Sequence, residues 1–335
     1  MTNGKMGLGL IGLGAWGSSL ATAAAQCGEA EVVNGFSRTG ETRKAFAEKH
    51  GCRTSATLDA LLGDPEVEGV LIATPHSAHE EVIERAAAAG KHLFVEKPLT
   101  LTVAGAKKAI RAAESAGVIL QVGFKRRRLG ATRRIREMLD KGELGVLHQL
   151  EGVISVPAGQ NPPQGWRNDR AECPDGGMTT MSVHLVDNFN YLAGPVKRVF
   201  AFSKKILGQG NLDDATVIGM EFESGPLGYL STSWVVPKLI TTAAYGTEAA
   251  AWSEEDGSKL YLQKKEESAR RELPVEAGDP VGDQLAEFAR CVREGTSPEA
   301  GAPEGLEVTA VLQAIESSAE TGEAVDVSSF RNIES

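Results

Sequence analysis

The chain has 335 residues, which is long for one hydrophobic core, so we expect two domains. Its formal net charge of −10 opposes binding to nucleic acid or to an anionic membrane surface, and no apolar run has the length of a membrane span. The four cysteines are widely spaced and form no CxxC pair, so the sequence predicts neither a metal site nor a disulfide framework, and a cytoplasmic location is favoured.

The first predicted elements are a strand and a helix joined by glycines. An apolar run over residues 6–11 leads through Gly12-x-Gly14-x-x-Gly17 into a helix that starts near Trp16. In a dinucleotide-binding turn, the first glycine permits the tight turn, the second lets backbone approach a pyrophosphate, and the third lets the helix pack on the strand. The phosphates then lie on the helix N-terminus. A purely structural glycine turn is the alternative.

Apolar runs alternate with helical stretches over the first 124 residues. Strands are predicted at residues 6–11, 31–37, 69–73, 92–95 and 118–122. Further helices are predicted at residues 42–49, 58–62, 78–89 and 103–115. This alternation is typical of an α/β fold with a doubly wound parallel sheet, so we assign residues 1–124 to a Rossmann domain that binds NAD(P).

The second part of the chain, residues 125–335, follows a different pattern. Helices are predicted at residues 132–141, 178–192, 281–294 and 305–321. Strands are predicted at residues 146–156, 196–202, 215–222, 227–235, 241–246 and 260–264. Most of these strands follow one another without long helices between them. We therefore expect an α/β domain with an open, mainly antiparallel sheet that has helices on one face.

The end of the second strand indicates which dinucleotide is bound. An acidic residue at this position binds the ribose 2′-hydroxyl of NAD, whereas this chain has Ser37 and Arg38 and no acid before Glu41. A hydroxyl and a guanidinium suit a 2′-phosphate, so we expect NADP(H) to be preferred, with NAD(H) as the other option. An arginine that begins a solvated turn is the alternative interpretation.

Two polar motifs follow strands of the first domain. Thr74-Pro75-His76-Ser77-Ala78-His79 comes after the strand at 69–73, and Glu96-Lys97-Pro98 comes after the strand at 92–95. Ligands of open α/β sheets bind beyond the carboxyl ends of the strands, where both motifs are expected. Lysine is rarely placed inside a fold unless its ammonium has a task. Both motifs are therefore candidates for the chemistry.

With these motifs, the chain resembles the Gfo/Idh/MocA oxidoreductases over nearly its whole length. The motifs are IGLGAWG, ATPHSAH, FVEKPL and GGMTTMSVHLVD, supported by VGFKRR, YGTEAA and AIESSAETGEAV. The resemblance implies a Rossmann domain followed by a second domain that binds substrate and forms a homodimer or homotetramer through the open sheet face. It also implies an NAD(P)-dependent enzyme that interconverts a secondary alcohol and a carbonyl on a small sugar or polyol.

The same resemblance assigns roles to individual residues. Lys97 would contact the reacting hydroxyl and the nicotinamide, and His184 would be the acid/base. Histidine suits proton transfer near neutral pH, and an ammonium stabilises a developing alkoxide. The residues expected to line the cofactor are Gly12, Gly14, Ala15, Trp16, Gly17, Ser37, Arg38, Thr74, Pro75, His76, His79, Glu96 and Lys97.

The helix of the second domain departs from the family pattern Asp-x-Gly-x-His-x-x-Asp. Thr180 stands in place of the first acid, and Ser182 in place of the glycine. Thr180, His184 and Asp187 share one face of an α-helix, so we expect them to form a polar cluster near the substrate. Asp187 either orients His184 or is an ordinary surface or capping acid. Without a carboxylate at Thr180, His184 should be less readily protonated.

A second departure is the basic segment at residues 122–128. Arg126 and Arg127, with Trp166 and Arg167 further along, are candidates for binding a carboxylate or phosphate on the substrate. A solvated basic helix is the alternative. Two other functions stay open at this stage. Some relatives cleave glycosides with tightly held NAD, and others bind a dinucleotide as sensors without doing chemistry.

Overall fold

The computed structural model describes residues 4–157, 165–207 and 210–332, and these fall into two compact units. The first unit comprises residues 1–124 with Asp279–Leu306, and the second comprises Lys125–Gly278 with Glu307–Glu334. The first segment of the first unit ends at residue 124, which is the position of the expected domain boundary. Residues 279–306, which lie within the second domain expected at 125–335, are grouped with the first unit. In the described part of the chain, no helix is long and apolar enough to cross a membrane.

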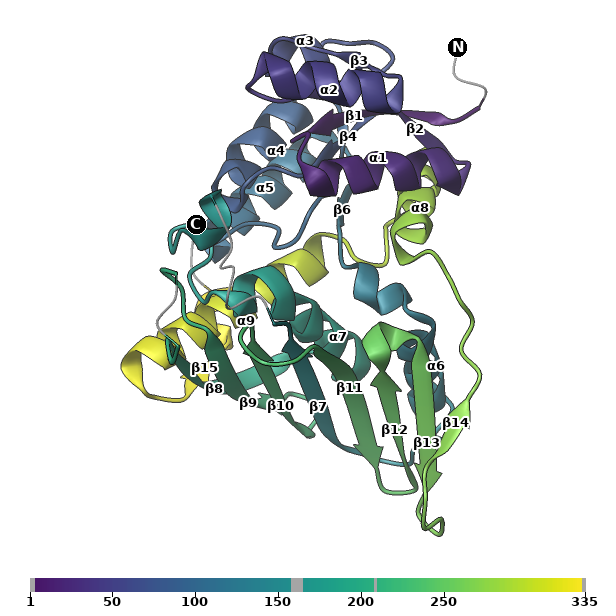
Figure 1. Cartoon of the computed structure of the whole chain (residues 1–335), viewed down its shortest axis with the longest axis vertical. Coiled ribbons are helices and arrows are strands. Elements are labelled where there is room, and N and C mark those ends of the chain that lie inside the picture. The colour runs from purple at the N-terminus through teal and green to yellow at the C-terminus, as the bar shows by residue number, and fades with distance from the viewer. Residues whose placement is uncertain (1–3, 158–164, 208–209, 333–335) are drawn as a thin grey trace. The chain divides into compact units, whose positions relative to one another are not determined.

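The described residues of the first unit form a parallel six-stranded sheet in the order β3-β2-β1-β4-β5-β6 (Figure 1). The strands are β1 (Met6–Ile11), β2 (Ala30–Phe36), β3 (Arg53–Thr54), β4 (Gly69–Ile72), β5 (His92–Val95) and β6 (Leu120–Val122). The helices between them are α1 (Ala15–Cys27), α2 (Gly40–His50), α3 (Leu58–Leu62), α4 (His79–Ala88) and α5 (Val103–Ala116). The predicted doubly wound sheet is confirmed, and only the two-residue strand β3 was not expected.

The core of the first unit explains why residues 279–306 belong to it. Helix α8 (Pro280–Glu294) contributes Leu285, Phe288 and Ala289 to a buried cluster that also holds Leu10 and Leu20. The Phe288 ring packs edge-on against Phe94, with ring centroids 5.9 Å apart. Each large side chain buried in this way contributes about 1.5–3 kcal/mol to folding. A Rossmann helix is thus supplied by a segment more than 150 residues distant from the rest of its domain.

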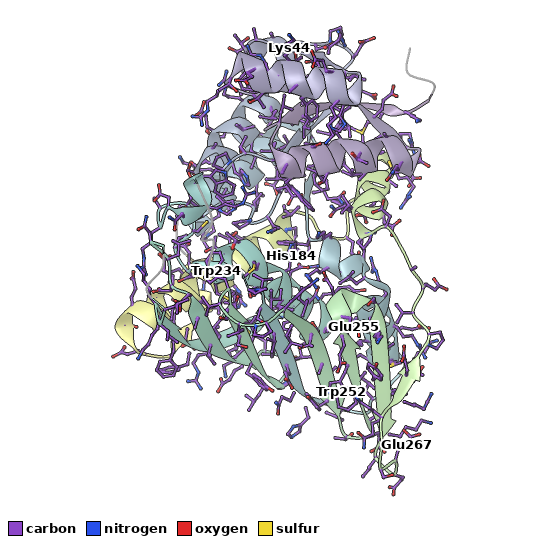
Figure 2. All side chains as sticks on the ribbon, in the orientation of Figure 1. Lys44, His184, Trp234, Trp252, Glu255 and Glu267 are labelled. Carbon is purple, nitrogen blue, oxygen red and sulfur yellow. The ribbon has the colours of Figure 1, made fainter. Side chains whose placement is uncertain are left out.

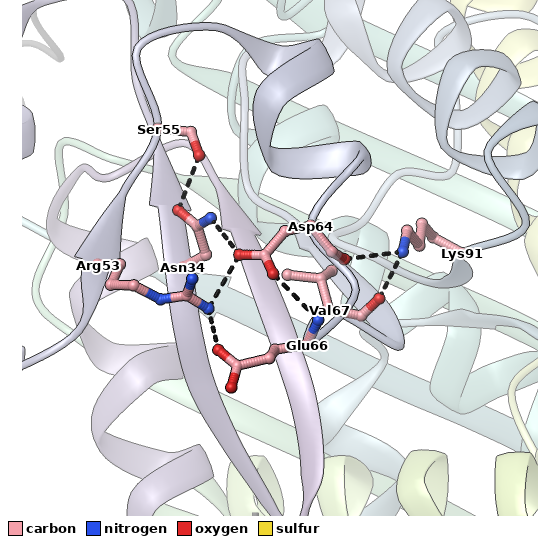
Figure 3. Close-up of polar contacts among 7 residues, drawn as sticks. All are labelled: Asn34, Arg53, Ser55, Asp64, Glu66, Val67 and Lys91. Atoms are coloured by element: carbon pink, nitrogen blue, oxygen red, sulfur yellow. Dashed lines mark hydrogen bonds and ion pairs between the residues drawn. The ribbon is translucent and has the colours of Figure 1, made fainter. Parts of the chain in front are cut away.

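A polar network ties β2 to β3 and to the loop before β4 (Figure 3). Asn34 donates to a carboxylate oxygen of Asp64 at 2.7 Å and accepts from Ser55 at 3.1 Å. Arg53 lies 3.0 Å from the same carboxylate. Burial opposes ionisation of Asp64, but bonds from the Glu66 N–H and Asn34 and the charge of Arg53 more than offset it. The pKa of Asp64 is therefore held below its ordinary value.

In the second unit, nine described strands form a sheet in the order β14-β13-β12-β11-β7-β10-β9-β8-β15. The strands are β7 (Leu147–Ser155), β8 (Val196–Lys204), β9 (Ala215–Phe222), β10 (Leu227–Ser233), β11 (Leu239–Gly246), β12 (Ala249–Glu254), β13 (Lys259–Lys264), β14 (Arg271–Leu273) and β15 (Val325–Asp326). Only β7 and β10 pair in parallel. The expected mainly antiparallel sheet is therefore confirmed, although β12, β14 and β15 were not predicted.

One face of this sheet packs on helices, and the other is open. Figure 1 shows α6 (Gly130–Asp140), α7 (Val183–Ala193) and α9 (Ala302–Thr321) on one side of the strands. Helix α9 begins in the first unit and belongs to the second from Glu307 onward, and a short helix, α10 (Ser328–Arg331), follows β15. Burial alternates along β9, because every second side chain points away from the helices toward the open face of the sheet.

Candidate active site

The glycine turn after β1 has the geometry that its sequence predicts. Gly12 adopts a φ of +101°, and a Cβ there would lie 2.5 Å from the carbonyl oxygen of Ala73. A Cβ on Gly17 would lie 2.1 Å from the carbonyl oxygen of Gly12. Both distances are far below van der Waals contact, so these positions require glycine. The turn thus brings the start of α1 against the ends of β1 and β4.

Gly14 differs from Gly12 and Gly17 because it faces open space. Among the described residues, apart from its chain neighbours, no atom lies within 4 Å of a Cβ built there, and Gly14 caps α1 without a side-chain hydrogen bond. The first N–H groups of a helix have no partners within the helix, and they attract anions. The space beside Gly14 therefore fits the pyrophosphate of a dinucleotide.

The segment after β2 carries a cluster of basic and hydroxyl groups. Arg38 is exposed and Ser37 is half-buried. Arg43, on the first turn of α2, donates from Nη1 to the carbonyl oxygens of Ser37 at 2.6 Å and Arg38 at 3.2 Å. Arg43 was missed in the sequence, although an arginine six residues after the strand was a visible signal. It fixes the backbone of the two residues expected to select the cofactor.

The Thr74 loop after β4 supplies a second feature that fits a ligand. Thr74 Oγ1 is buried and has no hydrogen-bond partner among the described residues. Pro75 precedes a short 3₁₀ turn, His76–Ala78, in which His76 is buried. A buried hydroxyl without a hydrogen bond is costly, so we expect a partner beyond the described residues.

His79 is fully buried at the start of α4 and joins two loops. Its Nδ1 lies 3.0 Å from the carbonyl oxygen of Pro98 and 3.2 Å from that of Leu99. Its Nε2 lies 3.3 Å from the carbonyl oxygen of Thr74. The ring therefore bridges the loops after β4 and β5. Its expected contact with the cofactor stays a prediction.

The residues after β5 are held closely. Glu96 is buried, and its carboxylate lies against Gly123, where a Cβ would approach Oε1 to 3.0 Å. Lys97 is half-buried and is joined to Pro98 by a cis peptide bond. Gly123 N–H donates to the carbonyl oxygen of Val95 at 2.8 Å, which continues the sheet pairing to the point where Glu96 begins.

In the second unit, His184 lies on α7 and is 7% exposed (Figure 2). The helix expected at 178–192 begins instead as a π-helix, Met178–Ser182, and becomes α-helical at Val183. Thr180 donates from its hydroxyl to the carbonyl oxygen of Gly176 at 3.2 Å. Because π-helical turns are wider, the α-helical spacing used to group Thr180 with His184 does not apply before Val183.

Asp187 binds Arg127 with both carboxylate oxygens. The Nε of Arg127 lies 2.8 Å and 2.9 Å from these oxygens, and its Nη2 lies 2.7 Å from the first of them. Arg126 is also buried and pairs with Asp256. The structure thus places both arginines on carboxylates of the second unit. Substrate binding by Arg126 and Arg127, and orientation of His184 by Asp187, stay predictions.

Trp166 and Arg167 form a stacked pair in the 3₁₀ turn Gly165–Asn168. The Arg167 guanidinium carbon lies 4.1 Å from the centroid of the Trp166 ring, and Arg167 is exposed. Trp166 packs against the buried cluster of Cys173, Leu212 and Trp234, the last of which is labelled in Figure 2. The Trp166 ring is thus anchored to the buried cluster, while the Arg167 guanidinium stays accessible to solvent.

Asp175 was overlooked in the sequence. It is buried just before the two glycines that lead into the π-helix. Burial raises the pKa of Asp175 to about 8, and the negative charges of Glu316, Asp213 and Glu320 add to the rise, while Arg170 opposes it. A charged residue directly before Gly176-Gly177 was the available signal, but its burial depends on the tertiary fold.

Comparison with known proteins assigns the chain to a family. Residues 6–124 match the profile of an oxidoreductase family with an NAD-binding Rossmann fold, and residues 132–252 match the GFO/IDH/MocA C-terminal domain. Myo-inositol 2-dehydrogenase from Thermotoga maritima is 31% identical over 236 residues, which make up 68% of each chain. The chain belongs to the Gfo/Idh/MocA oxidoreductase family. It is an NAD(P)-dependent oxidoreductase that acts on CH–OH groups, in a family of sugar and polyol oxidoreductases.

Other known proteins align over more of the chain. The 1,5-anhydro-D-fructose reductase of Ensifer adhaerens is 26% identical over 333 residues, covering 95% of this chain and 98% of the reductase. A crystal structure from Desulfitobacterium hafniense, of a protein proposed to be an NADPH-dependent oxidoreductase, superposes with a TM-score of 0.93. It is 31% identical and covers 99% of this chain and 100% of that one. Levoglucosan dehydrogenase in complex with NADH, at 23% identity over 96% of this chain and 99% of its own, shares the fold with a TM-score of 0.89.

Proposed function

We propose that this family member is an NADP(H)-dependent oxidoreductase that interconverts a secondary alcohol and a carbonyl on a sugar or sugar-like polyol. The observation that carries the cofactor preference is the end of β2, where Ser37 and Arg38 replace an acid and Arg43 holds their backbone. The similarity to the Desulfitobacterium hafniense protein supports the same preference. The similarity to an anhydrofructose reductase and an inositol dehydrogenase supports the substrate class.

The residues of the first unit would hold the cofactor as follows. The N–H groups at the start of α1, beside Gly14, bind the pyrophosphate, and Arg38 binds the 2′-phosphate. Thr74, whose buried hydroxyl has no partner among the described residues, would donate that hydroxyl to the dinucleotide. When bound, the nicotinamide gives or takes a hydride at the reacting carbon. Lys97 places a positive charge beside the oxygen on that carbon and stabilises it as it becomes an alkoxide.

His184 then exchanges the proton of that oxygen. In alcohol oxidation the neutral imidazole accepts the hydroxyl proton, and in carbonyl reduction the imidazolium returns it. The ordinary pKa of histidine is close to neutral, so neither direction needs a large shift. Thr180, in place of the usual acid, leaves His184 without a carboxylate at that position. Trp166 and Arg167 are proposed to contact the substrate beyond the reacting carbon, through an apolar ring face and a guanidinium.

The experiment is a panel screen of the purified protein. Aldoses, ketosugars, 1,5-anhydro-D-fructose, inositols and dihydrodiols are each tested with NADP(H) and with NAD(H), with cofactor absorbance as the readout. The expected result is turnover with a higher kcat/KM for NADP(H). Equal or better efficiency with NAD(H) would overturn the cofactor preference. Glycoside cleavage without added cofactor, or no redox turnover with either cofactor, would instead favour a glycoside-cleaving enzyme or a sensor.

We also propose that the open sheet face joins two copies of the chain into a homodimer or a larger homo-oligomer. The supporting observation is a group of apolar side chains on neighbouring strands, Phe202, Val217, Leu227 and Tyr229, each at least 39% exposed. Apolar side chains gathered on one face are typical of an interface. Light scattering of the protein and of Val217→Glu tests this, because the substitution should shift the population toward monomer.

A further inference from the structure

The ring of His79 is arranged to hold two loops together. It is fully buried, and its two nitrogens face in different directions. Nδ1 faces the carbonyl oxygens of Pro98 and Leu99 after β5, at 3.0 Å and 3.2 Å. Nε2 faces the carbonyl oxygen of Thr74 after β4, at 3.3 Å. Since carbonyl oxygens only accept hydrogen bonds, each contact requires an N–H on the imidazole. The doubly protonated ring donates to both loops, whereas the neutral ring donates to one.

Each of these loops carries a residue that the proposed function uses. Pro98 follows Lys97 directly, so a ring bonded to the Pro98 carbonyl restricts the peptide next to the lysine. Thr74 lies beside the glycine turn, since a Cβ on Gly12 would approach the Thr74 nitrogen to 3.0 Å. The ring of His79 therefore links the backbone beside Lys97 to the loop that adjoins the phosphate-binding turn.

We propose that His79 is a positioning residue, which fixes Lys97 relative to the cofactor loop through the carbonyl oxygens of Thr74, Pro98 and Leu99. This inference rests on the proposed role of Lys97 at the reacting oxygen. Displacement of a catalytic group by about 1 Å costs on the order of 100-fold in rate, so a clamp at this place has a large effect on kcat. His79 itself touches neither the hydride nor the transferred proton in this proposal.

The first test compares His79→Ala with His79→Gln and with a control, His92→Ala. His92 is a partly buried histidine that, like His79, contacts the backbone, because it accepts from the Ile119 N–H at 3.1 Å. It lies at the first residue of β5, at the opposite end of the strand from Lys97. Kinetics use the panel compound with the highest kcat/KM. We expect kcat to fall by about tenfold or more in His79→Ala, to recover partly in His79→Gln, and to change little in His92→Ala.

The second test is a double-mutant cycle with Lys97→Met, measured in single turnovers with enzyme in excess. If His79 acts through Lys97, His79→Ala lowers the rate in the wild-type background and has little further effect in Lys97→Met. Equal losses in both backgrounds would overturn the inference. A His79→Ala variant with unchanged kcat would also overturn it, as would a loss of kcat in His92→Ala as large as that in His79→Ala.

A third measurement needs no substrate and covers the case in which the panel gives no turnover. Acetylation of Lys97 by acetic anhydride is followed by mass spectrometry, with exposed Lys44 as the internal standard. Release of the loop in His79→Ala should change the labelling rate of Lys97 by about threefold or more, relative to Lys44. An unchanged rate contradicts the clamp. By contrast, wild-type kcat in Lys97→Met would refute the proposed role of Lys97 while leaving the labelling result to judge His79.

Discussion

Arg127 and Asp187 form a buried, bidentate ion pair, although 60 positions separate them in the sequence. The side chain of Asp187 is fully buried and that of Arg127 is 6% exposed. The Arg127 guanidinium also lies 5.3 Å from the ring centroid of Tyr191, one turn further along α7. The pair therefore fixes α7, the helix that carries His184, to the segment that follows the first unit.

Removal of one partner of this ion pair should lower the free energy of unfolding far more than apolar replacement of both partners. Asp187→Ala leaves a buried guanidinium without its carboxylate, so we expect the free energy of unfolding to fall by about 3–5 kcal/mol. The double variant Arg127→Met/Asp187→Leu should recover most of this loss, because apolar replacements of a buried pair are often neutral. Urea unfolding followed by circular dichroism measures both values.

The surface pair of Arg136 and Asp140 provides the matched control for this comparison. Their side chains are 37% and 54% exposed, so Asp140→Ala should cost only about 0–1 kcal/mol. A loss in Asp187→Ala no larger than that in Asp140→Ala would show that the buried pair does not hold α7.

Local sequence patterns predicted most elements near the site, whereas contacts between distant segments were not predictable. The strands Met6–Ile11 and His92–Val95 are buried apolar runs bounded by turn residues, and helix Leu58–Leu62 has a threonine cap, so local chemistry specifies all three. The π-helix before His184 has no comparable local signal. Strand β12 begins with three alanines, which favour helix, and it forms because β11 and β13 pair with it.

The site residues also divide into those that local sequence predicts and those that depend on contacts between distant segments. The roles of Gly12 and Gly17 were predictable, because a spacing of glycines within one turn reports the geometry of that turn. The partners of Arg127, His79 and Asp175 were not, because each depends on which segments the fold brings together. The placement of α8 in the first unit was missed for the same reason, because the buried cluster that receives its side chains is formed mainly by residues near the start of the chain.

Arg38 should control the choice between the two cofactors. Charge-assisted bonds to a phosphate contribute about 1.5–3 kcal/mol, so Arg38→Ala should raise the KM for NADPH by roughly 10- to 100-fold and that for NADH much less. Arg43→Ala should act in the same direction but less strongly, because Arg43 holds the carbonyl oxygens of Ser37 and Arg38. Lys44→Ala, an exposed neighbour on α2 that is labelled in Figure 2, is the control. A uniform rise in KM for both cofactors would contradict selection by Arg38.

Removal of the His184 imidazole should affect the chemical step. His184→Asn is expected to lower kcat by about 10²- to 10⁴-fold, the usual contribution of proton transfer, with little change in the Kd for NADPH. Steady-state kinetics and NADPH fluorescence measure the two effects separately. His148→Asn, on an exposed position of β7, is the control. If the kcat of His184→Asn stays within twofold or so of wild type, another group exchanges the proton.

Asp64 should make the first unit sensitive to acid. Its pKa is lowered in the folded protein, so its stabilising contribution is fully present above its unfolded pKa of about 3.9 and is lost as the pH falls through the folded value. Asp64→Asn should therefore be less stable than wild type at pH 7, and the difference should shrink below pH 4 or so. Urea unfolding of both proteins between pH 7 and pH 3 checks this. A difference that stays constant over that range would show that the charge of Asp64 is not what stabilises the network in Figure 3.

The contribution of Asp175 to stability should depend on pH in the opposite direction to that of Asp64. Its pKa is raised to about 8 in the folded protein, first by burial and then by Glu316, so the folded state keeps a proton that the unfolded state releases near pH 4. Stability then falls as the pH rises between these two values, because the unfolded state binds fewer protons.

Asp175→Asn removes the titration and should make the protein more stable than wild type at pH 8, by a few kcal/mol at roughly 1.4 kcal/mol per pKa unit. The two proteins should converge only below pH 4 or so, where wild-type Asp175 is protonated in both states. Thermal unfolding of the pair across this range decides the matter, and a wild type that is the more stable protein at pH 8 would mean that the Asp175 carboxylate is ionised and has a stabilising partner.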